Sequence, residues 1–162
     1  MLRVDHAGEF GATRIYDGQL AVIRHGPARA EIARMAEQEQ RHLAAFEVLL
    51  RERRVRPTLL APLWDAAGYA LGAATALLGE QAAMACTVAV EEVIDEHYQG
   101  QADRLGDAEP ALKATIIEFR DDELAHRPTA LDRGAAETPG YDVLSAAIKA
   151  GSRLAIWLST RL

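Results

Sequence analysis

Among the residues of this chain whose types and spacing could support catalysis or metal binding, two copies of a Glu-x-x-His motif stand out. They occupy residues 39–42 (EQRH) and residues 123–126 (ELAH). Residues three apart on a helix lie on one face with their Cβ atoms about 5–6 Å apart, so that a glutamate and a histidine at this spacing can bind the same ion. Each motif is therefore a candidate half of a metal site.

A single glutamate precedes each motif at nearly the same distance. Glu9 lies 30 residues before Glu39, and Glu91 lies 32 residues before Glu123, so the chain repeats itself over roughly residues 1–54 and 80–131. A four-helix bundle that supplies one Glu from each of two helices and a Glu-x-x-His from each of the other two is typical of di-iron and di-manganese carboxylate proteins. The predicted ligands are Glu9, Glu39, His42, Glu91, Glu123 and His126. This mixed oxygen and nitrogen set suits redox-active iron.

Each of these residues also has an ordinary interpretation, since a helical glutamate or histidine is usually a solvated surface residue. For Glu91 that interpretation is weak, because residues 84–90 are almost wholly apolar and an unpaired buried carboxylate there is costly. The spacing alone leaves the choice between Glu91 and Glu92 open, because adjacent helical residues point about 100° apart.

Other polar residues near the predicted ligands are candidates for a supporting role. Metal-bound imidazoles usually donate their distal N–H to an acceptor that fixes the ring. The candidates are Asp5, Asp95, His97, Tyr98 and Asp122, and Gln38 matches the position of Asp122 directly before a motif. A plain surface role is the alternative for each of them, and His97 is also a candidate proton relay.

The distribution of glycine and proline predicts an all-α fold. Long alanine-rich stretches end at a few breaks, and strand patterns are nearly absent. We expect helices over residues 3–24, 28–53, 63–78, 80–105 and 110–126. Pro128 predicts that the fifth helix is disturbed or ends after His126. A sixth helix, with Thr138 as its N-cap and Pro139 in its first turn, is expected to complete the chain.

The composition predicts one globular domain over residues 1–162 and excludes several classes of protein. The net charge is -6 and the basic residues are scattered, which argues against nucleic-acid binding. The single cysteine, Cys86, excludes an internal disulfide and a thiolate zinc site. The same cysteine count suits a reducing compartment, so we expect a cytoplasmic location. Charged residues begin at Arg3, without the pattern of a signal peptide or a transit peptide, so that either the protein is not exported or a leader has been removed.

The third expected helix is unusually apolar. Its longest charge-free run, residues 66–79, has 14 residues, whereas a membrane-spanning helix needs about 20. Trp64 and Tyr69 favour a membrane interface, but a buried core helix explains the composition equally well. The last helix, with Trp157 among its apolar residues, leaves the same alternatives open, and either face could instead bind a partner protein.

The longer motifs resemble the demethoxyubiquinone hydroxylase family of ubiquinone biosynthesis over essentially the whole chain. The similarity rests on RVDHAGEFGA (residues 3–12), IYDGQ (15–19), EQEQRHLAAF (37–46), RVRPTLLAPLWDAAGYALGAATALLGE (54–80), ACTVAVEEVIDEHY (85–98) and FRDDELAH (119–126). Carried over by position, the family's iron ligands fall on the six residues predicted above. The resemblance therefore favours Glu91 over Glu92.

The resemblance implies a ferritin-like four-helix bundle with additional apolar and C-terminal helices. It also implies a monooxygenase that uses two iron ions and dioxygen to hydroxylate the ring of a polyprenylated demethoxy-benzoquinol. Electrons would come from NADH or a reductase, although no dinucleotide fingerprint occurs in the chain. The expected partners are the quinone, a membrane surface and a lipid-presenting protein, with a peripheral location on the cytoplasmic face of the cell membrane.

Two other functions fit parts of the pattern. A ferritin-like iron oxidase or storage protein would use the same ligands, but the apolar third helix argues against a soluble cage. A metal-free helical scaffold is the non-enzymatic alternative, and bound iron would exclude it. Manganese in place of iron would favour catalase-like chemistry.

Overall fold

The computed structural model describes residues 1–162 and contains helices but no strands. The α-helices are α1 (Leu2–Val22), α2 (Pro27–Glu52), α3 (Ala61–Leu77), α4 (Glu80–Leu105), α5 (Pro110–Asp132) and α6 (Tyr141–Ser159), with a short 3-10 helix at Ala135–Glu137. The predicted all-α fold is confirmed. None of the helices combines the length and the apolar character that crossing a membrane requires.

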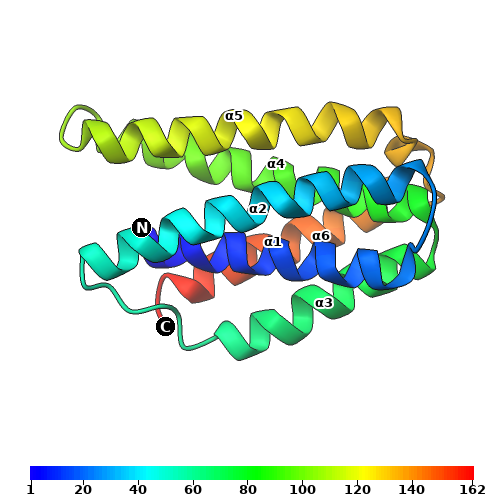
Figure 1. The fold of residues 1–162 in the computed structure, drawn as a ribbon, viewed down its shortest axis with the longest axis horizontal. Coiled ribbons are helices and arrows are strands. Elements are labelled where there is room, and N and C mark those ends of the chain that lie inside the picture. Colours follow the sequence, from blue (N-terminus) through cyan, green and yellow to red (C-terminus); the bar gives the residue numbers. More distant parts are fainter.

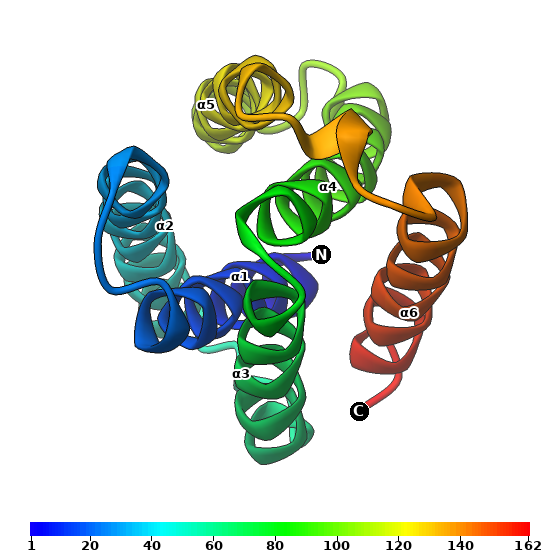
Figure 2. The same ribbon diagram turned by 90° about the vertical axis from the view of Figure 1, so that its right-hand side faces the viewer.

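Four of the helices form a bundle, and the other two cover one side of it. Figure 1 shows the helices running roughly along the long axis of the molecule. Seen from the end, α1, α2, α4 and α5 surround a common centre, and α3 and α6 lie outside α1 and α4 (Figure 2). The helices α1 and α4 therefore belong both to the bundle and to the layer that α3 and α6 complete.

Proline and glycine set most helix boundaries as expected. Pro27 and Pro110 begin α2 and α5, where a missing N–H costs nothing. Gly79 separates α3 from α4 with φ of 121°, a conformation that L side chains rarely adopt. The helix α1 ends two residues before the expected Arg24, and α3 begins two residues before the expected Leu63.

The expected end of the fifth helix at His126 is wrong, because α5 continues through Pro128 to Asp132. Pro128 and Leu124 are both exposed, and the proline removes the N–H that would bond to the Leu124 carbonyl. The continuation carries Ala130 into a fully buried position. Packing of this last turn offsets the cost of the proline.

The expected N-cap of the sixth helix is also wrong. The helix α6 begins at Tyr141, with Gly140 at the N-cap position and φ of 72° there. The Thr138 hydroxyl is buried without a hydrogen-bond partner, while its carbonyl accepts from the Tyr141 N–H at 3.0 Å. The Pro-Gly pair forms a tight turn before the helix, and this turn displaces the cap by two residues.

Two apolar clusters fill the interior of the bundle. Along α2, Ile32 and Met35 belong to one cluster and Phe46 and Leu50 to the other. Along α5, Ile116 and Phe119 belong to the cluster of Phe46, and Ala130 to the cluster of Met35. The two Glu-x-x-His motifs fall between these clusters on their helices, so apolar side chains flank them on both sides.

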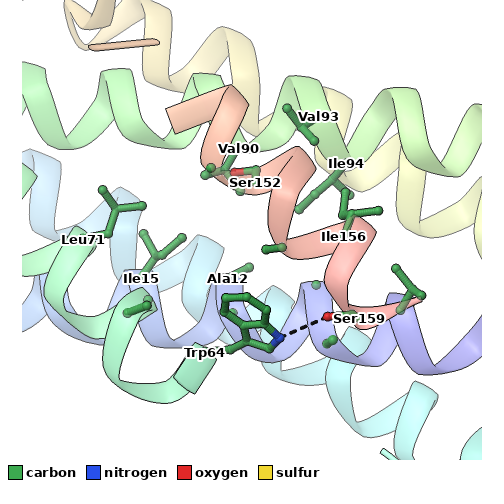
Figure 3. A pocket seen from close by; sticks show the side chains of 18 residues that line it. Ala12, Ile15, Trp64, Leu71, Val90, Val93, Ile94, Ser152, Ile156 and Ser159 are labelled. Carbon is green, nitrogen blue, oxygen red and sulfur yellow. Dashed lines mark hydrogen bonds between the residues drawn. The ribbon is translucent and has the colours of Figure 1, made fainter. Parts of the chain in front are cut away.

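An apolar cavity of about 320 Å³ lies between α1, α4, α3 and α6 (Figure 3). Its walls are formed mainly by aliphatic side chains, alanine and glycine, among them Ile15, Leu71, Val90 and Ile156. At one edge the Trp64 Nε1–H donates to the Ser159 hydroxyl at 3.0 Å, which ties α3 to the end of α6. The cavity is thus partly covered by the two outer helices.

Glycines allow α1 and α3 to pack backbone against backbone. A Cβ on Gly72 would collide with the carbonyl of Ile15, and one on Gly68 would lie 2.9 Å from the carbonyl of Gly11. A Cβ on Gly18 would collide with the carbonyl of Tyr69. These atoms belong to backbones that cannot move aside cheaply, so the close approach of the two helices depends on glycine.

We predict that Gly72→Ala lowers the free energy of unfolding by about 1–3 kcal/mol, the usual cost of overpacking a well-packed interior. Gly151→Ala in α6 is the matched control, because no atom lies within 4 Å of its added Cβ. The control should be neutral or stabilising by up to about 1 kcal/mol through helix propensity. Thermal denaturation followed by circular dichroism measures both, and equal stability of the two variants would refute the close packing.

Candidate metal centre

The six predicted ligands converge on one place inside the bundle. We call Glu9, Glu39, His42, Glu91, Glu123 and His126 the six-residue cluster; they come from α1, α2, α4 and α5, and each is at most 3% exposed. One group of ligand atoms within 4.8 Å of one another comes from Glu9, Glu39, His42 and Glu123. A second group comes from Glu39, Glu91, Glu123 and His126. Glu39 and Glu123 belong to both groups.

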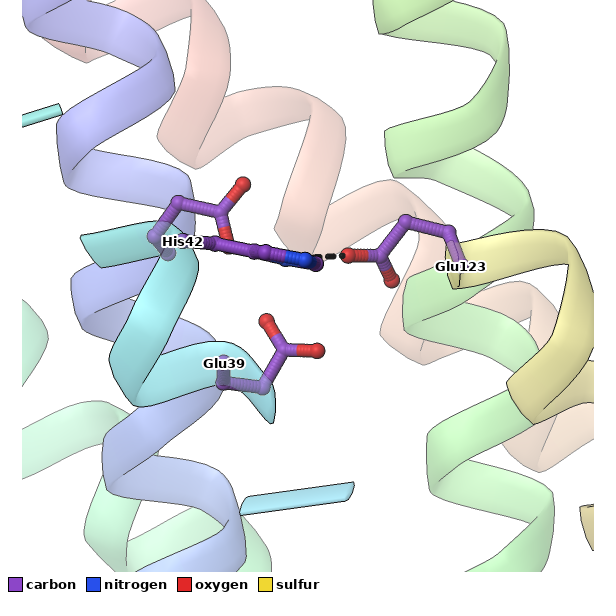
Figure 4. Close-up of side chains that lie close together, drawn as sticks. Glu39, His42 and Glu123 are labelled. Atoms are coloured by element: carbon purple, nitrogen blue, oxygen red, sulfur yellow. Dashed lines mark ion pairs between the residues drawn. The ribbon is translucent and has the colours of Figure 1, made fainter. Parts of the chain in front are cut away.

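Both imidazoles point their Nδ1 atoms into the cluster. His42 Nδ1 lies 3.4 Å from Glu123 Oε1 and 3.7 Å from Glu9 Oε2. Figure 4 shows Glu39 and His42 on α2 facing Glu123 on α5 across this space. His126 Nδ1 lies 3.4 Å from Glu91 Oε1 and 3.5 Å from Glu39 Oε1. The two histidines thus face the glutamates in the same way from opposite sides.

The structure places Glu91 inside the bundle and Glu92 outside it. Glu91 is 3% exposed and reaches the cluster, whereas Glu92 forms ion pairs with Arg127 of α5 and Lys149 of α6. Glu92 therefore links the outer surfaces of three helices. This arrangement agrees with the choice that the family resemblance favours.

Many polar atoms of the cluster are buried without a hydrogen-bond partner. They are Glu9 Oε2, both oxygens of Glu39, His42 Nδ1, Glu91 Oε2 and both oxygens of Glu123. Buried polar atoms almost always find a partner, because leaving one unpaired costs about 1–3 kcal/mol. Carboxylate oxygens and imidazole nitrogens together suit divalent ions such as iron and manganese. The residues therefore fit a pair of metal ions.

Two tyrosines form hydrogen bonds with Glu9 and Glu91, which we call the outer glutamates. Each bond joins the two halves of the repeat. The Tyr16 hydroxyl, on α1, donates to Glu91 Oε1 on α4 at 2.8 Å. The Tyr98 hydroxyl, on α4, donates to Glu9 Oε1 on α1. Each tyrosine lies seven residues after the glutamate of its own helix. The two bonds fix Oε1 of each glutamate and leave Oε2 buried without a hydrogen-bond partner.

The distal nitrogens of the imidazoles have acceptors outside the cluster. His42 Nε2 lies 2.9 Å from Asp122 Oδ2, and His126 Nε2 lies 3.1 Å from Gln38 Oε1. With Nε2 protonated, each imidazole donates outward and presents a lone pair on Nδ1 inward. Of the predicted supporting residues, Asp122 and Tyr98 therefore contact the cluster, as does Gln38.

The other three predicted supporting residues lie away from the cluster. Asp5 bonds to His97 Nε2 at 3.0 Å and to Gln101, which forms a separate buried polar group between α1 and α4. Asp95 pairs with Arg120 near the surface. The structure brings none of Asp5, Asp95 and His97 into contact with an imidazole of the cluster.

Burial and mutual repulsion change the acidities of these groups. Burial raises the pKa of Glu39 well above its ordinary value, and the charges of Glu9 and Glu91 raise it further. Burial also raises the pKa of Glu9, although the neighbouring His42 imidazole, whose Nδ1 lies 3.7 Å from Glu9 Oε2, acts against this shift. Burial and the charge of Glu91 raise the pKa of Tyr16 well above 10.0, so its hydroxyl remains a neutral donor. Burial raises the pKa of Cys86 to about 12, which leaves it an unreactive thiol.

Sequence reasoning missed Tyr16, although a second repeat could have revealed it. Tyr-x-Gly-Gln occurs at residues 16–19 and again at residues 98–101, in each case seven positions after the outer glutamate. Seven residues are two helical turns, so the tyrosine returns to the face of the glutamate. Because both tetrapeptides begin seven residues after an outer glutamate, the sequence could have predicted equivalent roles for Tyr16 and Tyr98.

We predict that the metal-free protein loses stability as the pH rises. The folded-state pKa of Glu39 is raised from 4.5, so above that value the folded state binds more protons than the unfolded state, and each further rise in pH favours unfolding. Urea denaturation of the apoprotein between about pH 5 and about pH 8 measures this slope. Glu39→Gln should flatten it, whereas Glu37→Gln, an exposed position on the same helix, should leave it unchanged. An apoprotein that gains stability over this range would contradict the prediction.

Known proteins resemble this chain over nearly its full length. The family model described as "Ubiquinone biosynthesis protein COQ7" matches residues 1–159. A 3-demethoxyubiquinol 3-hydroxylase of Rhodospirillum rubrum is 60% identical over 162 residues, covering 99% of this chain and 76% of the relative. The human NADPH-dependent 3-demethoxyubiquinone 3-hydroxylase, mitochondrial, is 51% identical over 166 residues, covering 100% of this chain and 76% of the relative.

The similarity extends to more distant relatives. The 5-demethoxyubiquinone hydroxylase, mitochondrial, of Saccharomyces cerevisiae is 42% identical over 179 residues, covering 100% of this chain and 77% of the relative. The resemblance inferred from the longer motifs is thereby confirmed. On its family match and these identities, the chain belongs to the COQ7 family of ubiquinone biosynthesis proteins.

Proposed function

We propose that this protein is a di-iron monooxygenase that hydroxylates the ring of a polyprenylated demethoxy-benzoquinol in ubiquinone biosynthesis. The observation that carries the proposal is the six-residue cluster, whose residues form two overlapping groups of ligands and contain seven buried atoms without hydrogen-bond partners. The names of the relatives supply the substrate class and the reaction. A metal-free scaffold would leave these atoms unpaired, which argues against that alternative.

In this proposal Glu9 and His42 would hold one iron and Glu91 and His126 the other, and Glu39 and Glu123, which belong to both groups of ligand atoms, would serve both. Bound iron would supply the electrons that activate dioxygen for hydroxylation of an aromatic carbon. Tyr16 and Tyr98 orient the outer glutamates through their hydroxyl groups. Phe119, whose ring centroid lies 4.1 Å from that of His42, stacks on this imidazole and excludes water from it.

The apolar cavity is the proposed site for the quinone. Its lining includes Gly8 and Val90, the residues directly before Glu9 and Glu91, so it adjoins the two helices that carry the outer ligands. Burial of each methylene of a polyprenyl tail stabilises the complex by about 0.8 kcal/mol. Electrons come from a reduced nicotinamide cofactor in this proposal, in keeping with the NADPH dependence printed in the names of several relatives.

We also propose that α3 and α6 face a membrane or a lipid-presenting partner. Their exposed apolar side chains include Leu63, Leu77, Leu154 and Trp157, all at least half exposed. A tailed quinone leaves a bilayer only at high cost, so its hydroxylase must reach the lipid. The eukaryotic relatives are named mitochondrial. For this chain we propose a peripheral location on the cytoplasmic face of the cell membrane.

We predict that Glu39→Ala and Glu123→Ala each abolish hydroxylation while the helical fold persists. Either change removes a carboxylate that contacts both proposed metal positions, whereas apolar packing holds the bundle. Product analysis with a short-tailed demethoxyquinol, together with iron content and circular dichroism, measures the effects. Glu37→Ala on the exposed side of α2 is the control and should keep both iron and activity. Iron-free wild-type protein with full hydroxylase activity would refute the di-iron assignment.

We predict that the protein binds liposomes through α3. Charged substitution of two exposed leucines, Leu77→Glu with Leu78→Glu, should abolish co-flotation with phospholipid vesicles, because these side chains are 75% and 74% exposed. Ile117→Glu is the control, since Ile117 lies on α5, on the other side of the bundle from α3 (Figure 2). Wild-type protein that never floats, or equal loss in both variants, would contradict a role of this face.

A further inference from the structure

The two halves of the six-residue cluster are nearly equivalent. Each half offers one outer glutamate held by a tyrosine of the opposite half, and one imidazole with Nδ1 facing inward. Glu39 and Glu123, one from each half, belong to both groups of ligand atoms. Any difference between the two proposed metal positions must therefore come from groups that this symmetry does not repeat.

The acceptors behind the imidazoles break the symmetry. Gln38 and Asp122 occupy equivalent positions, each directly before the glutamate of a Glu-x-x-His motif. His42 Nε2 faces a carboxylate oxygen of Asp122 at 2.9 Å, whereas His126 Nε2 faces the amide oxygen of Gln38 at 3.1 Å. Asp122, whose side chain is 40% exposed, forms its ion pair with His42 and none with an arginine or lysine.

A carboxylate and an amide affect an imidazole differently. A carboxylate that accepts the distal N–H makes the imidazole a stronger base and therefore a stronger metal ligand, and loss of such a partner typically lowers metal affinity 10–100-fold. An amide oxygen fixes the ring orientation but carries no net charge. Both rings are thus held in place, while only His42 has a carboxylate within hydrogen-bond distance of its distal nitrogen.

We propose that Asp122 and Gln38 make the two metal positions unequal, so that the ion at Glu9 and His42 is bound more tightly than the ion at Glu91 and His126. This inference rests on the proposed di-iron centre. Asp122 is a positioning residue here, because it acts through His42. The position of Glu91 and His126 is accordingly the one that fills last and empties first.

Anaerobic titration of the apoprotein with Fe(II) against a competing chelator tests the proposal. Asp122→Asn should weaken the tighter of the two binding steps about 10–100-fold and leave the weaker step nearly unchanged. Asp122→Glu should restore the tight step, because it restores the charge. Asp121→Asn is the matched control: the neighbouring exposed residue loses the same charge without facing an imidazole, and both steps should stay at their wild-type values.

The reciprocal variant examines the other position. Gln38→Glu should strengthen the weaker step and bring the two affinities together. Two iron ions bound with affinities that Asp122→Asn and Gln38→Glu leave unchanged, or that Asp121→Asn changes equally, would overturn this inference and leave the di-iron centre standing. Wild-type protein that binds no iron would overturn both. Circular dichroism of each apoprotein verifies that the variants are folded.

Discussion

The burial of four carboxylates in one small space is the constraint on which the rest of the structure depends. Glu9, Glu39, Glu91 and Glu123 are each at most 3% exposed, and their oxygens face one another. Like charges at this separation repel, and burial removes the water that would screen them. The raised pKa values of Glu9 and Glu39 are the direct result. A helical bundle tolerates such a centre only because apolar packing on both sides holds the helices together.

The two halves of the internal repeat together hold the four carboxylates in place. Each half contributes two long helices, and the tyrosine of each half bonds to the outer glutamate of the other. Neither half can therefore form the centre alone. The bonds from Tyr16 and Tyr98 link α1 to α4 at the level of the cluster, where direct packing between these two helices is sparse. Polar contacts there add to the apolar side chains of α1 and α4 that share the two clusters, such as Ile15 with Val90.

Much of the centre could be predicted from the sequence because the relevant residues are close together along the chain. The contacts that could not be predicted join residues that are far apart in the sequence. The Glu-x-x-His pairs lie within one helical turn, so their shared face follows from helix geometry. The bond of Tyr16 to Glu91 joins residues 75 positions apart, and no local rule predicts it. The continuation of α5 past Pro128 depends likewise on tertiary packing of Ala130, which outweighs the local preference of proline.

The position of α1 and α4 explains how one helical bundle can combine a polar centre with an apolar cavity. On one side these helices face α2 and α5 across the six-residue cluster; on the other they face α3 and α6 across the apolar cavity. Adjacent residues serve the two sides, because Gly8 and Val90 line the cavity while Glu9 and Glu91 point into the cluster. Small residues on α1, such as Ala7 and Gly11, keep this wall thin. In the proposed function, a ring in the cavity is therefore separated from the metal centre by little more than the two helices that hold its outer ligands.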